Sequence, residues 1–345
     1  MINKQKHLGQ VWTPKAIIKQ VLALITIVKP QLVLEPAAGS GRFYFLLKKL
    51  FPNVIGIEID PQVAKPPMEI NDYFATNYQP DLNITNPPYV AFKEITNKPV
   101  TKLLIHKPNL YHYFLEKALN DLKDDGQLIW IVPADIFTNS SAKYLNQLID
   151  QNYSITYWQI LPETIWDNAL ITTAILRIEK TINHPDKLKY CFINGKIIFG
   201  QPLIIDQKVI VKVGGVSGHN ALLKAGNVAF VNSKTIKTKQ PMMIDYQVAQ
   251  WIRPTPAPPN GFTYQIFVNC KSRNARPFYL LDWLNKGQFI NYDGSLLCIY
   301  TFSSKAKTQA LVDQLNNYDW STSGIKRSGR FHFSQSILKS IIKNA

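Results

Sequence analysis

The sequence has little cysteine and no long uninterrupted apolar run. Three cysteines, Cys191, Cys270 and Cys298, are distributed over 345 residues. Their odd number and wide spacing exclude a disulfide framework and a cysteine-based zinc site, as is typical of proteins in a reducing compartment. The sequence has no apolar run of the roughly 18 residues that a membrane span needs, and its first residues lack the apolar core of a signal peptide. We therefore expect a cytoplasmic protein.

Glutamate is missing from the second half of the chain. Residues 181–345 contain 21 Lys/Arg, seven Asp and no Glu, a net charge of +14, whereas residues 1–180 contain 18 Lys/Arg and 16 Asp/Glu, a net charge of +2. Such asymmetry predicts a polyanionic partner for the basic half. The hydrophobic fraction of 46% excludes a disordered chain.

The first half alternates short apolar runs with segments of helical periodicity. We expect strands at residues 31–35, 53–59, 81–85, 127–132, 154–160 and 170–178, and helices at 42–51, 109–123 and 140–149. This alternation predicts an α/β fold, a Rossmann-like, mostly parallel sheet with helices on both faces. Ligands of such sheets bind beyond the carboxyl ends of the strands.

The second half has short apolar runs broken by Gly, Pro, Asn and Ser, which indicates a mixed α+β domain. We place the boundary between the two domains near Asn183-His-Pro185. The sequence thus predicts a catalytic domain over residues 1–182 and a target-recognition domain over residues 183–345.

A glycine-containing turn follows the first predicted strand, in Leu34-Glu-Pro-Ala-Ala-Gly-Ser-Gly41. Glycine lets a backbone approach a ligand closely, and a helix N-terminus favours electron-rich groups. The turn is neither a Walker A loop nor a G-x-G-x-x-G motif. An ordinary tight turn explains it equally well when it is taken alone.

An acidic residue, Glu58, ends the next strand about 20 residues after that turn, a spacing at which a carboxylate can accept hydrogen bonds from ribose hydroxyls. A solvated carboxylate at a strand end is the alternative. Together the turn and Glu58 predict a cofactor that contains a nucleoside.

The tetrapeptide Asn86-Pro-Pro-Tyr89 follows the third strand. The prolines remove two N–H donors, so the Asn86 side-chain oxygen and the Pro87 carbonyl remain as acceptors. Two acceptors suit a ligand amino group, whose lone pair they can direct at an electrophile. The ring of Tyr89 is expected against the planar group that carries the amine. Beyond a strand end and after the other two motifs, these residues predict transfer of a group to an amino nitrogen.

This order of motifs resembles the gamma-class S-adenosylmethionine-dependent amino-methyltransferases, and most closely the TaqI-type adenine-N6 DNA methyltransferases. The resemblance covers residues 7–180 and, more loosely, 210–345. It includes Leu8-Gly-Gln-Val-Trp-Thr-Pro14, Asn71-Asp-Tyr-Phe74, the helix that contains Phe114 and the strand that ends at Pro133-Ala134.

The resemblance implies S-adenosylmethionine as cofactor, no metal, and a cofactor site made by several of these motifs. Thr13, Glu35 and Ala37 are implied at the methionine side, Glu58 at the ribose, and Asp72, Tyr73 and Phe114 at the adenine. Gly39 and Gly41 form the turn. The alternative for Phe114 is a core residue on the apolar face of its helix.

The resemblance also implies a flipped target base, because adenine N6 within a duplex is paired. Tyr89 and Trp166 are then expected on opposite faces of that base. Trp166 occupies a position where the family usually has Phe, and a buried core tryptophan is its alternative.

Three basic clusters in the second half are expected to bind the DNA backbone, since few acidic residues balance them. They are Lys234, Lys237 and Lys239; Lys271, Arg273 and Arg276; and Lys326, Arg327 and Arg330. Residues 213–220 resemble a glycine-rich element of the family's recognition domains.

Several rival functions stay open. An RNA adenine methyltransferase fits the same charge pattern. Protein-glutamine methyltransferases share Asn-Pro-Pro-Tyr, but they place an accessory helical domain before the cofactor motif, which here begins near residue 31. A DNA-binding module that has lost catalysis would lack reason to keep Asn86, Pro87 and Tyr89.

The sequence therefore predicts a site-specific DNA adenine-N6 methyltransferase of a restriction-modification system, acting on double-stranded DNA and, by resemblance, as a monomer. A fused nuclease is not expected, because only Asp206-Gln-Lys208 resembles a fragment of a nuclease motif. A separately encoded endonuclease is the expected partner.

Overall fold

The computed structural model of the chain separates into two compact units, residues 1–199 and 200–345. It describes residues 12–166, 171–215, 225–238, 242–244, 256–281, 285–321, 325–327 and 329–344. No helix in these described ranges is long and apolar enough to cross a membrane.

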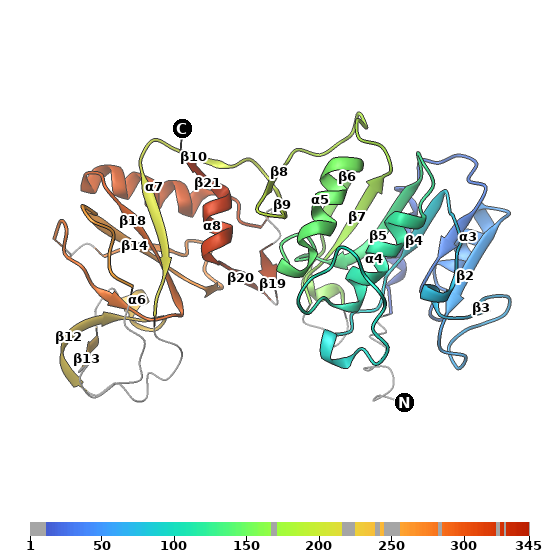
Figure 1. Cartoon of the computed structure of the whole chain (residues 1–345), viewed down its shortest axis with the longest axis horizontal. Coiled ribbons are helices and arrows are strands. Elements are labelled where there is room, and N and C mark those ends of the chain that lie inside the picture. The colour runs from blue at the N-terminus through green and yellow to red at the C-terminus, as the bar shows by residue number, and fades with distance from the viewer. Residues whose placement is uncertain are drawn as a thin grey trace. The chain divides into compact units, whose positions relative to one another are not determined.

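The first unit is built on a seven-stranded sheet in the order β3-β2-β1-β4-β5-β7-β6 (Figure 1). Its strands are β1 (Val33–Glu35), β2 (Val54–Glu58), β3 (Glu69–Ile70), β4 (Leu82–Thr85), β5 (Gln127–Pro133), β6 (Ser154–Ile160) and β7 (Thr173–Glu179). The strands from β3 to β5 are parallel, and β7 is antiparallel to both of its neighbours. The predicted Rossmann-like α/β fold is confirmed.

Helices cover both faces of this sheet. They are α2 (Lys15–Leu22), α3 (Tyr44–Leu50), α4 (Leu110–Asp121) and α5 (Lys143–Asn152), with short 3₁₀ turns η1 (Tyr73–Ala75), η2 (Phe92–Glu94), η3 (Ser140–Ala142) and η4 (Glu163–Ile165). Alternate strand residues belong to two separate cores. Leu128 and Trp130 of β5 pack with α4 and α5, whereas Ile129 and Ile131 pack with α2 and α3. This alternation follows from the two-residue side-chain period of a strand.

The hairpin of β8 (Tyr190–Ile193) and β9 (Lys196–Phe199) belongs to the first unit. The ring of Phe199 stacks on Trp158 of β6 with centroids 4.8 Å apart, and Ile197 is buried in the same core. The division between the units therefore lies 17 residues after the boundary that we predicted at 182/183.

The second unit mixes short helices with small sheets, and β18 is central to the largest, in the order β11-β18-β14-β16. The elements are β10 (Leu203–Ile205), β11 (Val209–Val213), β12 (Ala225–Val231), α6 (Thr235–Thr238), β13 (Met242–Ile244), β14 (Tyr264–Asn269), β15 (Lys271–Ser272), β16 (Phe278–Leu280), β17 (Asn291–Tyr292), β18 (Leu296–Thr301), α7 (Lys305–Asn317), β19 (Lys326–Arg327), β20 (Arg330–His332), α8 (Gln335–Ile341) and β21 (Ile342–Asn344). Phe267, Tyr292 and Tyr300 lie in its buried core.

Candidate functional site

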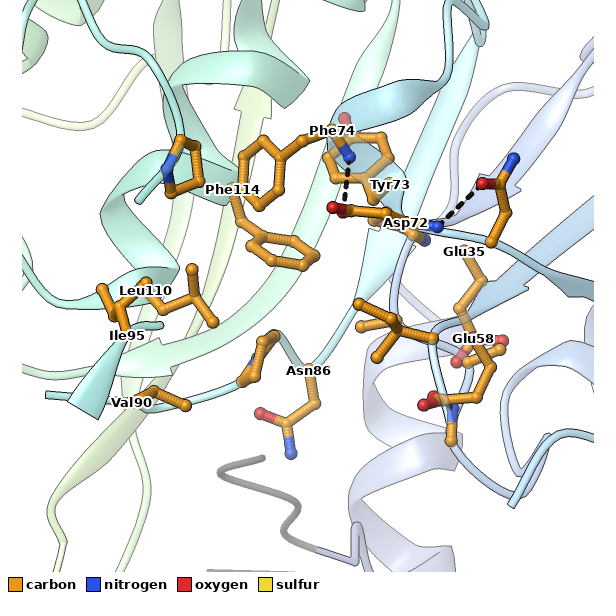
Figure 2. Close-up of a pocket in the computed structure, with 18 of the residues that line it drawn as sticks. Glu35, Glu58, Asp72, Tyr73, Phe74, Asn86, Val90, Ile95, Leu110 and Phe114 are labelled. Carbon is orange, nitrogen blue, oxygen red and sulfur yellow. Dashed lines mark hydrogen bonds between the residues drawn. The ribbon is translucent and has the colours of Figure 1, made fainter. Parts of the chain in front are cut away.

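A cavity of about 320 Å³ lies at the carboxyl ends of β1, β2 and β4 (Figure 2). In Figure 2 the acidic Glu35 and Glu58 lie on one side and the apolar Val90, Ile95 and Leu110 on the opposite side. Among the predicted site residues, those that line it are Thr13, Glu35, Ala37, Gly39, Glu58, Asp72, Tyr73, Asn86 and Phe114. The fold thus brings together motifs that are up to about 100 residues apart, because parallel strands present their carboxyl ends at one edge of the sheet.

The two glycines of the first turn have different surroundings. Both have positive φ, 55° at Gly39 and 83° at Gly41. A Cβ on Gly39 would meet nothing within 4 Å, whereas one on Gly41 would lie 2.2 Å from Cε of Met68 and 2.6 Å from the ring of Phe45. Gly39 therefore borders the cavity, whereas a side chain at Gly41 would require Met68 and Phe45 to move.

Substituting these glycines tests that difference. We expect Gly41→Ala to reduce the free energy of unfolding by about 2–4 kcal/mol, because it adds a steric conflict to an unfavourable backbone conformation. Gly39→Ala carries only the backbone cost, about 1 kcal/mol. Urea denaturation of the two variants measures both values, and equal losses would contradict the distinction.

Glu58 holds the glycine turn as well as lining the cavity. One carboxylate oxygen accepts the backbone N–H of Gly39 at 2.7 Å, and the other accepts that of Asp60 at 2.9 Å. Burial raises the pKa of Glu58, and these backbone N–H groups oppose the rise. Each oxygen keeps acceptor capacity, so the carboxylate can still receive hydroxyl donors from a ligand.

Glu35 is a buried acid that lacks a full set of hydrogen bonds. Its side chain is 2% exposed, and its Oε2 atom has no hydrogen-bond partner in the described part of the chain. Desolvation raises its pKa well above the usual value, and the charge of Glu58 raises it further, while a backbone N–H of Tyr44 opposes the rise. Such a group gains a great deal from a cationic or N–H-bearing ligand.

Two phenylalanines and Tyr73 form the aromatic part of the wall. Asp72 begins the turn η1, where its Oδ1 accepts the N–H of Phe74 at 3.0 Å. The ring of Phe74 meets that of Phe114 edge to face, with centroids 4.9 Å apart (Figure 2). Tyr73 is 2% exposed, and its hydroxyl donates to Asp121.

Phe74 is a lining residue that our sequence interpretation missed, because we assigned the adenine to the aromatic residue directly after Asp72. The η1 turn buries Tyr73 and leaves Phe74 half-buried at the cavity. The apolar wall of Val90, Ile95 and Leu110 was also missed, since no motif marks those positions.

Asn86 is held in a defined orientation at the cavity. Its Nδ2 donates to Thr13 Oγ1 at 3.2 Å, and its Oδ1 lies 2.7 Å from the Tyr89 hydroxyl. That hydroxyl also lies 3.0 Å from the carbonyl oxygen of Ile131, and burial raises the pKa of Tyr89 well above its usual range. Tyr89 therefore stays protonated and can donate to either oxygen.

Thr13 links this loop to the glycine turn. Arg42, directly after the turn, donates from Nη1 to the Thr13 carbonyl at 3.0 Å and lies over the ring of Trp12. Thr13 of the N-terminal motif thus contacts both Asn86 and Arg42, and so connects the Asn86 loop to the glycine turn.

Three residues of the predicted catalytic set do not line the cavity. Pro87 is buried, and the half-buried ring of Tyr89 meets Tyr111 edge to face. Trp166 is 5% exposed, packs in the core with Leu161, and donates from Nε1 to Thr173 Oγ1 at 2.9 Å. These contacts favour the alternative interpretation of Trp166 as a core residue.

The predicted basic clusters are only partly described. Lys239 and most of the glycine-rich element lie outside the described residues, and the side chains of Lys237, Lys326 and Arg327 are not described. Lys234, Lys271, Arg273 and Arg330 are exposed. Arg276 differs, because its guanidinium lies 3.5 Å from the carboxylate of Asp313.

Comparison with known proteins agrees with this geometry. The family described as Eco57I restriction-modification methylase matches residues 52–163. The Type II methyltransferase M.HincII of Haemophilus influenzae is 34% identical over 165 residues, which are 44% of this chain and 33% of that protein. M.AccI of Acinetobacter calcoaceticus is 24% identical over 216 residues, which are 55% of this chain and 40% of that protein. The aligned part of this chain thus spans about a third of the first of these relatives.

One solved structure aligns with nearly the whole chain. The Type IIL restriction-modification enzyme MmeI, solved in complex with DNA, matches 99% of this chain and 69% of its own with a TM-score of 0.59 and 12% identity. That likeness shows a shared fold. Taken together, the matched motifs, the sheet and the relatives show that this chain resembles the gamma-class DNA methyltransferases of restriction-modification systems.

Proposed function

We propose that the protein is a site-specific DNA methyltransferase that transfers a methyl group from S-adenosylmethionine to N6 of an adenine. One observation carries the proposal: the acceptor side chain of Asn86 opens on the same cavity as Glu35, Glu58 and the aromatic wall. A nucleoside cofactor and an amino group can therefore meet in one enclosed space.

The cavity residues fit this cofactor. The carboxylate of Glu58 would receive the ribose hydroxyls, Asp72 would accept from the adenine amino group, and the rings of Phe74 and Phe114, which contact each other, would form one wall beside the base. The unpartnered oxygen of Glu35 receives the α-ammonium of the methionine part. The cofactor supplies a methyl group on a positively charged sulfur, and no metal is needed.

Asn86 positions the amino group of the target. Its Oδ1 and the carbonyl of Pro87, which would have to open towards the cavity, are the proposed acceptors for the two N–H donors, and together they would direct the nitrogen lone pair towards the methyl carbon. A C–N bond forms as the C–S bond breaks, the sulfur takes the electron pair, and the nitrogen then loses a proton to solvent. Positioning of this kind accelerates a reaction without a strong general base.

The target base has to leave the duplex to reach the cavity. Tyr89 is the aromatic residue that we propose beside it. Trp166 packs in the core and does not line the cavity, so the second face of the base is left to other residues. The exposed cations of the second unit bind the duplex backbone.

Transfer to different acceptors tests the proposal. Purified protein with methyl-labelled cofactor is expected to label adenine in plasmid DNA and to leave RNA and protein unlabelled. Labelled cytosine would contradict the adenine assignment, and labelled RNA or protein would contradict DNA as the substrate. Size-exclusion chromatography of the same preparation tests the expected monomer, whereas the cytoplasmic location and the separately encoded endonuclease stay predictions.

The aromatic wall allows a sharper test of cofactor binding. We expect Phe74→Ala to weaken the affinity for S-adenosylmethionine roughly 5- to 100-fold, because it removes a stacking face. Tyr73→Phe should change that affinity little, since the hydroxyl that it removes is already bonded to Asp121. Titration calorimetry measures both, and an unchanged affinity in folded Phe74→Ala would contradict the assignment of the Phe74 ring to the base.

A further inference from the structure

A second cavity, of about 250 Å³, lies within the second unit. It is lined mainly by cationic and neutral polar side chains, among them Ser233, Asn269, Lys271, Arg273, Tyr279 and Arg330. No carboxylate belongs to this lining as the structure describes it. The cavity is therefore suited to an anionic ligand that also offers polar groups.

Residues of two basic clusters line this cavity, Lys271 and Arg273 of the second cluster and Arg330 of the third. Strand β15 pairs with β20, so that Lys271 faces His332 and Ser272 faces Phe331, which brings the second cluster beside Arg330 of the third. Ser233 precedes Lys234, the first residue of the remaining cluster. Segments up to about 100 residues apart thus contribute to one basic surface.

Within the described residues, no ion pair neutralises the cations at the cavity. The ion pairs of this unit, as far as the structure describes it, join Arg276 to Asp313 and Lys307 to Asp206. Lys271, Arg273 and Arg330 remain outside these pairs. Phosphate groups are the anions that arginine and lysine in such an arrangement hold well.

Asn269 gives the cavity a second kind of chemistry. It ends β14, is 7% exposed, and its Oδ1 has no hydrogen-bond partner within the described residues. A buried acceptor left without a donor is unfavourable, so a ligand that supplies an N–H group gains by binding there once the Asn269 side chain turns this oxygen into the cavity. A phosphate has no such donor at neutral pH, whereas the amino group of a nucleobase has two.

We propose that Asn269 reads one base of the DNA target, by accepting a hydrogen bond from an exocyclic amino group. Lys271, Arg273 and Arg330 hold the adjacent phosphates. Adenine and cytosine present such an amino group in the major groove. The inference rests on the proposed function only in taking DNA as the substrate. It assigns recognition of a base to Asn269, which belongs to none of the three basic clusters.

Selection of bound duplexes from a random-sequence library by the full-length protein tests the inference. The wild type is expected to enrich one motif. Asn269→Ala should relax that motif at one base pair, with a roughly 5- to 100-fold loss of preference for the amino-bearing base. Asn269→Asp keeps an acceptor and should keep the preference. Asn285→Ala, at an exposed asparagine of the same unit, is the matched control and should leave the motif unchanged.

The salt dependence of DNA binding distinguishes recognition of a base from binding to the phosphate backbone. Lys271→Ala should retain the motif, weaken binding to all sequences and reduce the slope of log affinity against log salt by about 0.9. Asn269→Ala should leave that slope and the affinity for random DNA unchanged. Thermal melting establishes that each variant is folded.

Three results would overturn the inference: no motif enriched by the wild type, an unchanged motif in folded Asn269→Ala, or an equal loss of binding on every sequence. The labelled-cofactor assay is independent of this selection. If methyl transfer fails while Asn269→Ala still relaxes the selected motif, the proposed function is wrong and the assignment of Asn269 stands.

Discussion

Replacing Asn86 with alanine is expected to reduce the rate of methyl transfer roughly 100- to 1000-fold, while the variant still binds S-adenosylmethionine. Asn86 Oδ1 is the proposed acceptor for the target amine, and loss of one positioned polar group at a reacting centre has effects of this size. Single-turnover transfer to DNA measures the rate, and calorimetry measures cofactor affinity.

Two further variants make the result specific to Asn86. Asn86→Asp keeps an acceptor oxygen and should retain measurable transfer, whereas the alanine variant should not. Asn152→Ala removes an exposed amide at the end of α5, which donates only to the Leu148 carbonyl, and should be fully active. If Asn86→Ala transfers methyl groups at the wild-type rate, the proposed role of the side chain has to be abandoned.

Replacing Glu35 with glutamine is expected to stabilise the ligand-free protein and to weaken cofactor binding roughly 10- to 100-fold. The two effects have one cause. Burial without a full set of partners raises the pKa of Glu35, so the ionised form destabilises the empty site, while the same charge attracts a cationic ligand.

The sign of the pH dependence follows from the direction of that shift. A raised pKa means that the folded protein binds this proton more tightly than the unfolded chain does. The free energy of unfolding of the ligand-free protein therefore falls as pH rises from the ordinary value of 4.5 to the raised pKa, and stays lower above it. Glu35→Gln should remove this contribution and raise the midpoint of thermal unfolding at neutral pH by a few degrees.

Glu69→Gln provides the comparison for Glu35. The Glu69 carboxylate accepts a hydrogen bond from the Tyr78 hydroxyl at 2.7 Å and does not line the cavity. We expect neither a gain in stability nor a change in cofactor affinity. A Glu35→Gln variant that melts earlier than the wild type without ligand would show that the carboxylate is structurally required.

The sequence predicted most of the sheet because its strands are buried and short. Strand 154–160 coincides with β6, and the predicted strand at 53–59 differs from β2 by one residue at each end. Glu35, Glu58 and Asn86 could be placed at one edge from their positions at the ends of strands. That inference needs only the order of the strands and no side-chain packing.

The positions of several side chains depend on packing, which the sequence pattern does not reveal. Trp166 and Phe74 are both aromatic residues near strand ends, yet one lies in the core and the other at the cavity. The strand β3 was not predicted because it has only two residues, whereas α2 was missed although its apolar residues Ile17, Ile18 and Val21 recur at helical spacing. Asn269 resembles any other asparagine in the sequence, and only the fold shows that its oxygen is buried beside three cations.

The hydrogen bond from the Gly39 N–H to Glu58 has a consequence for selectivity among adenosine-containing metabolites. ATP and dinucleotides share the adenosine group of the proposed cofactor. In the proteins that bind them, free backbone N–H groups at such turns donate hydrogen bonds to their phosphates. Here a carboxylate already accepts a hydrogen bond from that N–H, and among the described residues four acidic side chains and one basic side chain line the cavity. A polyphosphate is repelled where a sulfonium with an α-ammonium is attracted. We therefore expect the charge of this turn to disfavour ATP and dinucleotides relative to the proposed cofactor.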